Sequence, residues 1–242
     1  VFSIYRSPEL ASIGSMSTNE GSLVKLSTIL THYNLSRAYR ATIAWGDGSS
    51  SEIAGNGTFP TQRFHASHRY ADDGEYQVAV NVFDQLHWVA STPTTVTIGN
   101  VAPTLSPRTN LSGIEGVEQL FTLANFTDPG FTSETAGTTE TFAARINWGD
   151  GGPVQNVTVT ATNGSDGKLT TGRVSAAHRF ESYGTYNAEL SLQDDDGGIS
   201  TLTLPITVAN VLPKAQVPNQ ISGNEGGVID LGLTATDQGS RP

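Results

Sequence analysis

Apolar and polar residues alternate along several short segments of the chain, and no segment keeps an apolar period of about 3.6 residues. Residues 76–82 read Tyr-Gln-Val-Ala-Val-Asn-Val, and residues 186–192 repeat this alternation. Because successive side chains of a strand point to opposite faces, each segment is predicted to form a strand with one buried face. The segments 41–45, 144–148 and 202–208 alternate in the same way. The pattern therefore predicts a protein built from short strands.

Short motifs recur at a constant spacing, which indicates an internal repeat. The sequence Trp-Gly-Asp-Gly starts at Trp45 and again at Trp148, each time at the end of an alternating segment. Glu-Gly pairs at Glu20, Glu115 and Glu225 each follow a proline by 12 residues and mark three unit starts. Four further pairs are separated by 110 residues: His68 and His178, Tyr76 and Tyr186, Asp84 and Asp194, and Asn100 and Asn210.

The repeat divides the chain into units. We expect the end of an upstream unit and a linker at 1–8, a first full unit at 9–102, a second at 103–212, and the start of a third at 213–242. The sequence then looks like a piece of a longer array. The second unit carries an insertion of 8 residues before Trp148 and one of 7 residues after it, which we interpret as surface loops. About seven short strands per unit predict an antiparallel sandwich.

These motifs closely resemble the PKD (polycystic kidney disease) repeat family. The family pattern is a Trp-Gly-Asp-Gly turn, a His-x-Tyr strand, and a Gly-x-Tyr segment opening an alternating strand that ends in Asp. Both full units carry it, except that Phe180 replaces the Tyr of His-x-Tyr in the second. The resemblance implies an all-β chain of tandem immunoglobulin-like antiparallel β-sandwiches. It also implies an exported protein in which such units act as spacers, adhesion modules or accessory domains of secreted hydrolases.

Composition narrows the compartment and the class of partner. The formal net charge is −10, whereas a nucleic-acid or anionic-membrane partner calls for a basic face. No apolar stretch reaches the roughly 18–20 residues of a membrane span. The chain has no cysteine and is rich in Thr, Ser, Asn and Gly, which favours a bacterial or archaeal exported protein over a disulfide-rich secreted domain. We therefore expect an extracellular protein, either secreted or attached to a cell surface.

The densest acidic cluster, Asp194-Asp195-Asp196, predicts a calcium site because hard oxygen ligands suit Ca²⁺. By alignment this cluster ends a strand near a linker, and we place the site at the junction between the second and third units. The first junction is the poorer candidate. The alternative is a solvated Asp-Gly turn without an ion. The candidate ligands are Asp194, Asp195, Asp196, Asp128, Asn210 and Glu225.

Trp88 is the one tryptophan outside the repeat, and an exposed Trp can stack on sugar rings. It is the only sequence indication of carbohydrate binding. The alternative is an edge-strand or inter-domain contact.

No catalytic residue is predicted. Asp47 and Asp150 occupy a repeated turn, where capping the turn is the better interpretation. His68 and His178 are expected to be structural, because Ser67 beside the first becomes Ala177 beside the second. No Gly-x-Ser-x-Gly nucleophile motif occurs either.

Repetition of core and turn residues without any repeated reactive group predicts a non-catalytic spacer or adhesion module. Its expected partners are the neighbouring units of the same chain and a cell-surface protein or polysaccharide. The alternative function is a carbohydrate-binding accessory module of a secreted hydrolase. An enzyme is the third and weakest interpretation. Catalysis could reside in the parent protein outside these residues and still be absent from them.

Overall fold

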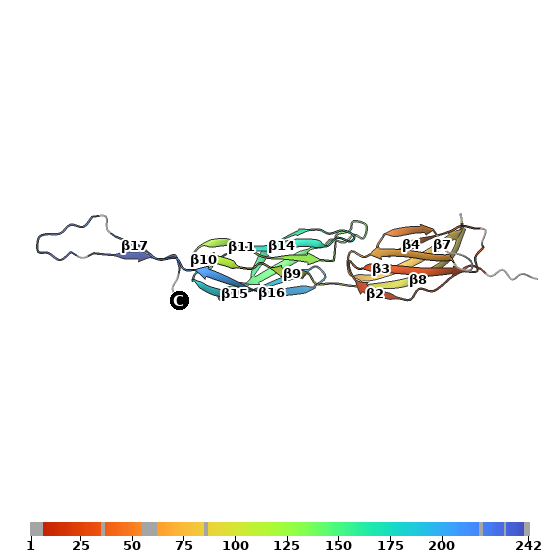
Figure 1. Ribbon diagram of the computed structural model, residues 1–242, viewed down its shortest axis with the longest axis horizontal. Helices are drawn as coiled ribbons and strands as arrows, with labels where there is room; N and C mark the ends of the chain where they lie inside the picture. Colours follow the sequence, from red (N-terminus) through yellow and green to blue (C-terminus); the bar gives the residue numbers. More distant parts are fainter. Residues whose placement is uncertain are drawn as a thin grey trace, which may run out of the picture.

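The computed structural model describes residues 7–34, 37–54, 62–84, 87–217, 220–229 and 231–239. All regular secondary structure in these ranges is β-strand, which confirms the predicted all-β fold of β-sandwiches. The two sandwiches lie end to end along the long axis of the molecule (Figure 1). None of the described residues forms a helix long and apolar enough to cross a membrane.

The first sandwich, unit 1, consists of two sheets with alternating burial along their strands. One sheet has the order β1-β3-β6, and the other has the order β2-β8-β7-β4-β5. The strands of the first sheet are β1 (Glu9–Leu10), β3 (Leu23–Thr31) and β6 (Gln62–Arg69). Those of the second are β2 (Met16–Asn19), β4 (Tyr39–Ala44), β5 (Ser50–Ala54), β7 (Gly74–Asp84) and β8 (His87–Gly99).

The second sandwich, unit 2, repeats this arrangement with the strand order β10-β16-β15-β12-β13-β14-β11-β9. The run is continuous because β13 pairs with β12 through 155–157 and with β14 through 158–162. One long strand thus passes from one sheet to the other. The strands are β9 (Thr104–Pro107), β10 (Leu111–Ile114), β11 (Glu118–Asp128), β12 (Phe142–Asn147), β13 (Gln155–Thr162), β14 (Thr170–Arg179), β15 (Gly184–Asp194) and β16 (Ile199–Ala209).

Each sandwich also contains one parallel pair, β2 with β8 and β10 with β16. The other strand pairs of the two sandwiches in the described ranges are antiparallel. The short second strand of each unit lies against the last strand of the same unit and runs in its direction. Sequence alternation fixes which face of a strand is buried, but it does not fix the direction of the neighbouring strand.

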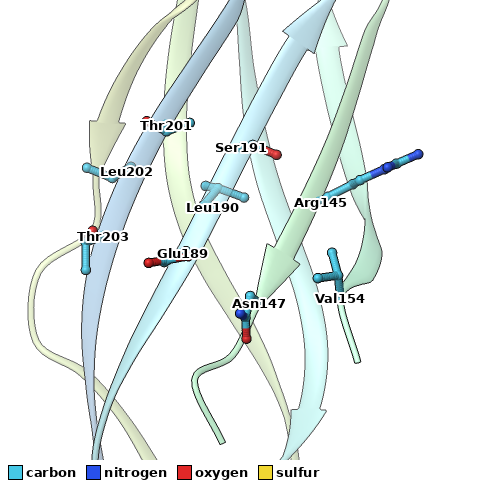
Figure 2. Close-up of a pocket in the computed structure, with 9 residues that line it drawn as sticks. All are labelled: Arg145, Asn147, Val154, Glu189, Leu190, Ser191, Thr201, Leu202 and Thr203. Carbon is cyan, nitrogen blue, oxygen red and sulfur yellow. The ribbon is translucent and has the colours of Figure 1, made fainter. Parts of the chain in front are cut away.

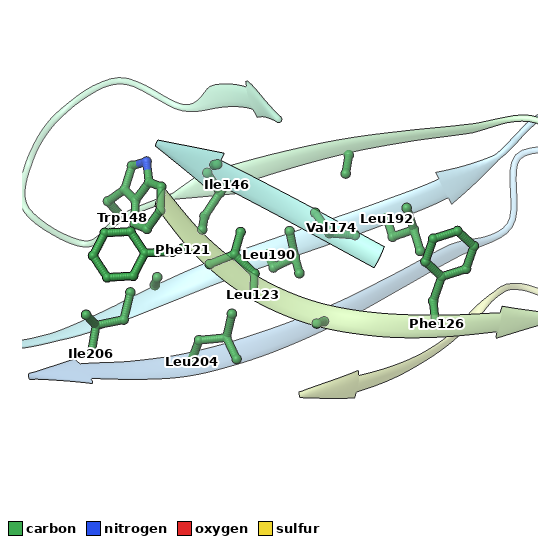
Figure 3. Packing of buried hydrophobic residues seen from close by; sticks show 14 of the residues in the cluster. Phe121, Leu123, Phe126, Ile146, Trp148, Val174, Leu190, Leu192, Leu204 and Ile206 are labelled. Carbon is green, nitrogen blue, oxygen red and sulfur yellow. The ribbon is translucent and has the colours of Figure 1, made fainter. Parts of the chain in front are cut away.

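The two apolar cores draw on residues 10–98 and 105–208 respectively. Each is centred on the repeated tryptophan, and Trp45 and Trp148 are both buried. In unit 2, the ring centroids of Phe121 and Trp148 lie 5.4 Å apart. Leu204 and Ile206 of β16 belong to the same core (Figure 3). Burial of an aromatic side chain of this size removes roughly 150–250 Å² from water, which makes it a main source of stability.

The turn after each tryptophan is joined to the opposite sheet by a histidine. Asp47 Oδ1 accepts from the Ser49 amide at 2.9 Å, while Asp47 Oδ2 lies 2.6 Å from His68 Nε2. The His68 ring also stacks on Trp45 at 4.9 Å. In unit 2, Asp150 pairs with His178 at 2.8 Å, and the His178 ring stacks on Trp148. These side chains therefore have structural partners, as the turn-capping interpretation predicts.

Beyond unit 2, the described residues form a short ribbon of β17 (Lys214–Gln216) and β18 (Thr234–Thr236). All six of its residues are exposed. Figure 1 shows this segment extending away from unit 2 along the molecular axis.

Candidate cation-binding junction

Two loops of unit 2 lie at its contact with unit 1. In the loop 131–141, the Phe131 amide donates to the Ala71 carbonyl at 3.0 Å. In the loop 163–169, Asp166 forms an ion pair of 3.3 Å with Arg69 Nε. These surface loops therefore also contact unit 1.

Glu20 connects the turn between β2 and β3 to the linker. Its Oε1 accepts from the Val101 amide at 2.8 Å, so unit 1 holds the chain that leaves it. Its Oε2 is buried and has no hydrogen-bond partner. The side chain is only 2% exposed, which means that this free oxygen faces protein rather than bulk water.

Three carboxylate oxygens, contributed by both units, lie close together at this junction. The carboxylates of Glu20, Asp72 and Asp196 each offer an oxygen, and these atoms all lie within 4.8 Å of one another. Asp72 lies in the turn between β6 and β7 of unit 1, and Asp196 lies in the turn between β15 and β16 of unit 2. The site is therefore shared by the two sandwiches.

Two further acids of unit 2, Asp128 and Glu140, are buried next to this group. Asp128 ends β11 and is 1% exposed, and its Oδ1 accepts from the Gly130 amide at 2.8 Å. Its Oδ2 is buried without a partner. Glu140 precedes β12 and is 8% exposed. A Cβ on Gly130 would lie 2.4 Å from Glu140 Oε2 and 3.0 Å from Glu20 Oε2, so both carboxylates crowd this glycine.

Asp194 and the linker complete the cluster. Asn100 Nδ2 donates to Asp194 Oδ1 at 3.2 Å, and the Gly198 amide donates to the same oxygen at 2.6 Å. Asn100 Oδ1 is buried and unpartnered. Asp195 Oδ1 accepts from the Thr141 amide at 3.1 Å. The junction therefore supplies neutral amide oxygens as well as carboxylates, the ligand mixture that Ca²⁺ accepts.

The shifted pKa values report an environment that disfavours several negative charges. Burial, followed by repulsion from Asp128, raises the pKa of Glu140 to about 9. Burial also raises the pKa of Glu20 to about 8 despite the Val101 hydrogen bond, and that of Asp128 to about 6 despite the Gly130 hydrogen bond. Desolvation and the neighbouring Asp72 raise the pKa of Asp196 to about 7.

No basic side chain in the described ranges forms an ion pair with these acids. Unit 1 differs at the repeat position of Asp194. There Asp84, also 6% exposed, pairs with the Arg37 guanidinium and lies 3.7 Å from His87 Nδ1. Unit 1 thus pairs this buried aspartate with the Arg37 guanidinium, whereas Asp194 forms no ion pair with a basic side chain in the described ranges.

The repeat position of Glu20 in unit 2 is also different. Glu115 Oε1 accepts from the Val211 amide at 2.7 Å, as Glu20 does from Val101. However, Glu115 Oε2 accepts from the Tyr183 amide at 2.9 Å. The second oxygen of the repeated glutamate is therefore occupied by backbone in unit 2 and free in unit 1.

The structure corrects the predicted location of the site. Asp128 and Asp194 to Asp196 do come together, but at the first junction and not at the second. Asn210 and Glu225 are exposed and do not join them. β15 and β16 are antiparallel, with Gln193 opposite Ile199, so Asn210 lies a full strand away from Asp194, roughly 35 Å at 3.4 Å per residue.

Sequence reasoning missed Glu20, Asp72 and Glu140 as site residues. Glu20 was recognised only as a marker of the repeat. Asp72 could have been found from its repeat position, because Ser182 stands there in unit 2 and an unrepeated acid calls for its own explanation. Nothing in the local sequence of Glu140 indicates burial.

Trp88 lies at the far end of unit 1 from this junction and is 61% exposed. It sits opposite Phe83 across β7 and β8, and only 96–99 of β8 pair with β2. Arg40 lies over the Phe83 ring at 5.7 Å and forms an ion pair of 2.7 Å with Glu52. The three side chains Arg40, Phe83 and Trp88 thus follow one another across neighbouring strands.

A hollow of about 500 Å³ on the outer face of β12, β15 and β16 is another feature that could hold a ligand. Arg145, Glu189 and Thr203 are among the side chains that surround it (Figure 2). No aromatic residue, histidine or cysteine lines it, so it carries neither a stacking surface nor a nucleophile–base pair.

No protein-family model and no curated protein sequence matches the chain. Among solved structures, the first two immunoglobulin domains of DIP-gamma share 13% identity over 85% of this chain and 99% of that chain, with a TM-score of 0.33. Fibronectin(III)-like modules of Clostridium thermocellum CbhA share 15% over 81% of this chain and 90% of theirs, with a TM-score of 0.27. Dpr2 Ig1-Ig2, in complex with DIP-Theta, shares 8% over 84% of this chain and 100% of its own, with a TM-score of 0.29.

Proposed function

We propose that the chain is a non-catalytic extracellular spacer, a tandem array of PKD-type sandwiches whose first junction is held together by Ca²⁺. The observation that supports a calcium site is that two carboxylate oxygens between the units, Glu20 Oε2 and Asp128 Oδ2, are buried without a hydrogen-bond partner. Burying like charges without compensation costs several kcal/mol per ion, and a divalent cation removes that cost.

The spacer role is supported by what the repeated residues do. The buried tryptophans and the His–Asp pairs have partners within each sandwich, so the repeat preserves architecture. Two unrepeated acids, Asp72 and Asp196, lie where the units meet. An ion ligated by both units would fix the angle between them. The array would then present its ends to a cell-surface protein or polysaccharide at a set distance.

The test is a thermal melt of the full chain with Ca²⁺ and with chelator. Calcium at 100 times its dissociation constant would stabilise unit 1 and unit 2 by about 2.7 kcal/mol, a rise of several degrees in Tm. Glu20→Gln and Asp196→Asn should each reduce this rise. Glu225→Gln is the matched control, because Glu225 is exposed and outside the cluster. Superimposable melts of the wild-type protein would contradict the calcium junction.

A second candidate function is carbohydrate binding, favoured by the row formed by the exposed Arg40 and Trp88 and the half-buried Phe83. Aromatic faces stack on the apolar faces of sugar rings, and the Arg40–Glu52 pair offers hydrogen bonds to hydroxyl groups. The repeat positions of Phe83 and Trp88 in unit 2 are Gln193 and Gly198. The row therefore belongs to unit 1 and is not part of the repeated architecture.

Pull-down on insoluble polysaccharides and a glycan array would test this candidate. Trp88→Ala and Phe83→Ala should each remove most binding, while Tyr183→Ala should leave it unchanged. Tyr183 is a suitable control because it is an aromatic of similar exposure, 59% against 61%, in unit 2. Absence of any glycan signal for the wild-type protein would exclude the candidate.

A further inference from the structure

The acids at the junction fall into two groups that share Glu20. In the first group, the oxygens of Glu20, Asp72 and Asp196 lie within 4.8 Å of one another. Twice a Ca²⁺–oxygen distance of about 2.4 Å is close to this span, so one ion fits among these three. Asp128 and Glu140 are not within this group, although both are buried.

The second group surrounds Gly130. Oxygens of Glu20 and Glu140 both press on this residue, where a side chain would displace them. Gly130 does not have a positive φ, so its lack of a side chain matters here for space and not for backbone conformation. Asp128 Oδ2 and Asn100 Oδ1 are buried and unpartnered. A single ion at the first group would leave Asp128 and Glu140 without a compensating cation.

We propose that the junction binds two Ca²⁺ ions bridged by the Glu20 carboxylate. The first ion is ligated by Glu20, Asp72 and Asp196, and the second by Glu20, Asp128 and Glu140. Each ligand set contains residues of both units, so each ion links the two sandwiches. This inference rests on the proposed calcium junction and adds its stoichiometry and its bridging ligand.

The experiment is a direct count of bound calcium on the full chain, stripped with chelator and titrated with Ca²⁺ by calorimetry and equilibrium dialysis. The wild-type protein should bind two ions. Glu140→Gln and Asp128→Asn should each bind one, and Asp72→Asn should also bind one. Glu20→Gln should weaken both sites at least tenfold, because it is the shared ligand.

Glu134→Gln is the matched control, since Glu134 is an exposed acid of the same loop as Glu140 and should leave two sites. Melts of the calcium-free variants establish that each is folded. One ion in the wild type, unaffected by Glu140→Gln, would overturn the two-ion inference and leave the calcium junction standing. No bound ion would overturn both.

Discussion

At the scale of single residues, the His–Asp pairs connect the two sheets of each sandwich. Asp47 follows a strand of the five-stranded sheet, and His68 belongs to the three-stranded one. Although burial raises the pKa of Asp47, hydrogen bonds from His68 and Ser49 outweigh it and lower the pKa to about 2. The ordinary value for Asp is about 3.9. Folding therefore favours the ionised carboxylate.

This shift predicts acid sensitivity of unit 1. Because the folded-state pKa lies below the unfolded value, the contribution of Asp47 is complete above about pH 4 and is lost as the pH falls toward 2. Asp47→Asn should cost about 1–3 kcal/mol at pH 7 and flatten the fall in Tm between pH 4 and 2. Glu52→Gln is the control, because that carboxylate is 61% exposed and should change stability little. An unaltered pH profile in Asp47→Asn would refute this role.

A second residue-scale prediction concerns Tyr70, the residue replaced by Phe180 in unit 2. The buried Tyr70 hydroxyl donates to the Trp45 carbonyl at 2.8 Å, whereas Phe180 has no such bond. Tyr70→Phe should therefore destabilise unit 1 by about 1–1.5 kcal/mol while keeping the ring packing. Chemical denaturation measures this loss, and Phe180→Tyr in unit 2 gives the reciprocal comparison. No loss in Tyr70→Phe would show that the hydrogen bond is energetically neutral.

At the scale of elements, the turns and loops at the ends of the strands decide how the units meet. The turn between β2 and β3 holds the linker through Glu20 and also touches unit 2 directly. Gly21 has a φ of +63°, and a Cβ there would lie 2.6 Å from the Pro129 carbonyl oxygen. Because that neighbour is backbone, it cannot swing aside as a side chain can.

Gly21→Ala should therefore undock the two units while leaving each sandwich folded. The expected result is a loss of calcium stabilisation and greater protease sensitivity at the linker, with both cores still giving cooperative melts. Gly151→Ala is the matched control, since Gly151 also has a positive φ of +85° but no atom within 4 Å of its would-be Cβ. If both variants behave alike, backbone strain and not the contact with Pro129 is responsible.

At the scale of the whole molecule, the two sandwiches lie end to end, and the proposed calcium junction predicts a rod whose stiffness depends on calcium. Direct contacts also act at this junction, namely the Phe131–Ala71 hydrogen bond and the Arg69–Asp166 ion pair. Calcium should therefore narrow an existing range of angles and not create the contact.

Small-angle X-ray scattering on the chain should show a longer, better-defined maximum dimension with Ca²⁺ than with chelator. Repulsion among the uncompensated acids is the reason to expect a broader distribution without the ion. Glu20→Gln should give the same profile in both conditions, and Glu225→Gln should respond as the wild type does. Identical wild-type profiles in the two conditions would show that direct contacts alone set the angle.

The sequence by itself determined most of the strands and the repeat. Alternation and spacing are local properties, so Trp45, Tyr76 and their counterparts could be placed without a structure. It also gave four acids of the candidate site, because Asp194 to Asp196 are adjacent and Asp128 stands in a distinctive Asp-Pro-Gly.

Only the tertiary structure decided where those acids lie and which others join them. Strand direction places Asp194 and Asn210 at opposite ends of unit 2, although both follow long strands in sequence. Three separate turns supply Glu20, Asp72 and Glu140, which lie up to 120 positions apart in the sequence. Folding brings them to the same junction. Alternation is set by neighbours along the chain, whereas a junction site is set by which ends of strands meet, and that is a property of the folded molecule alone.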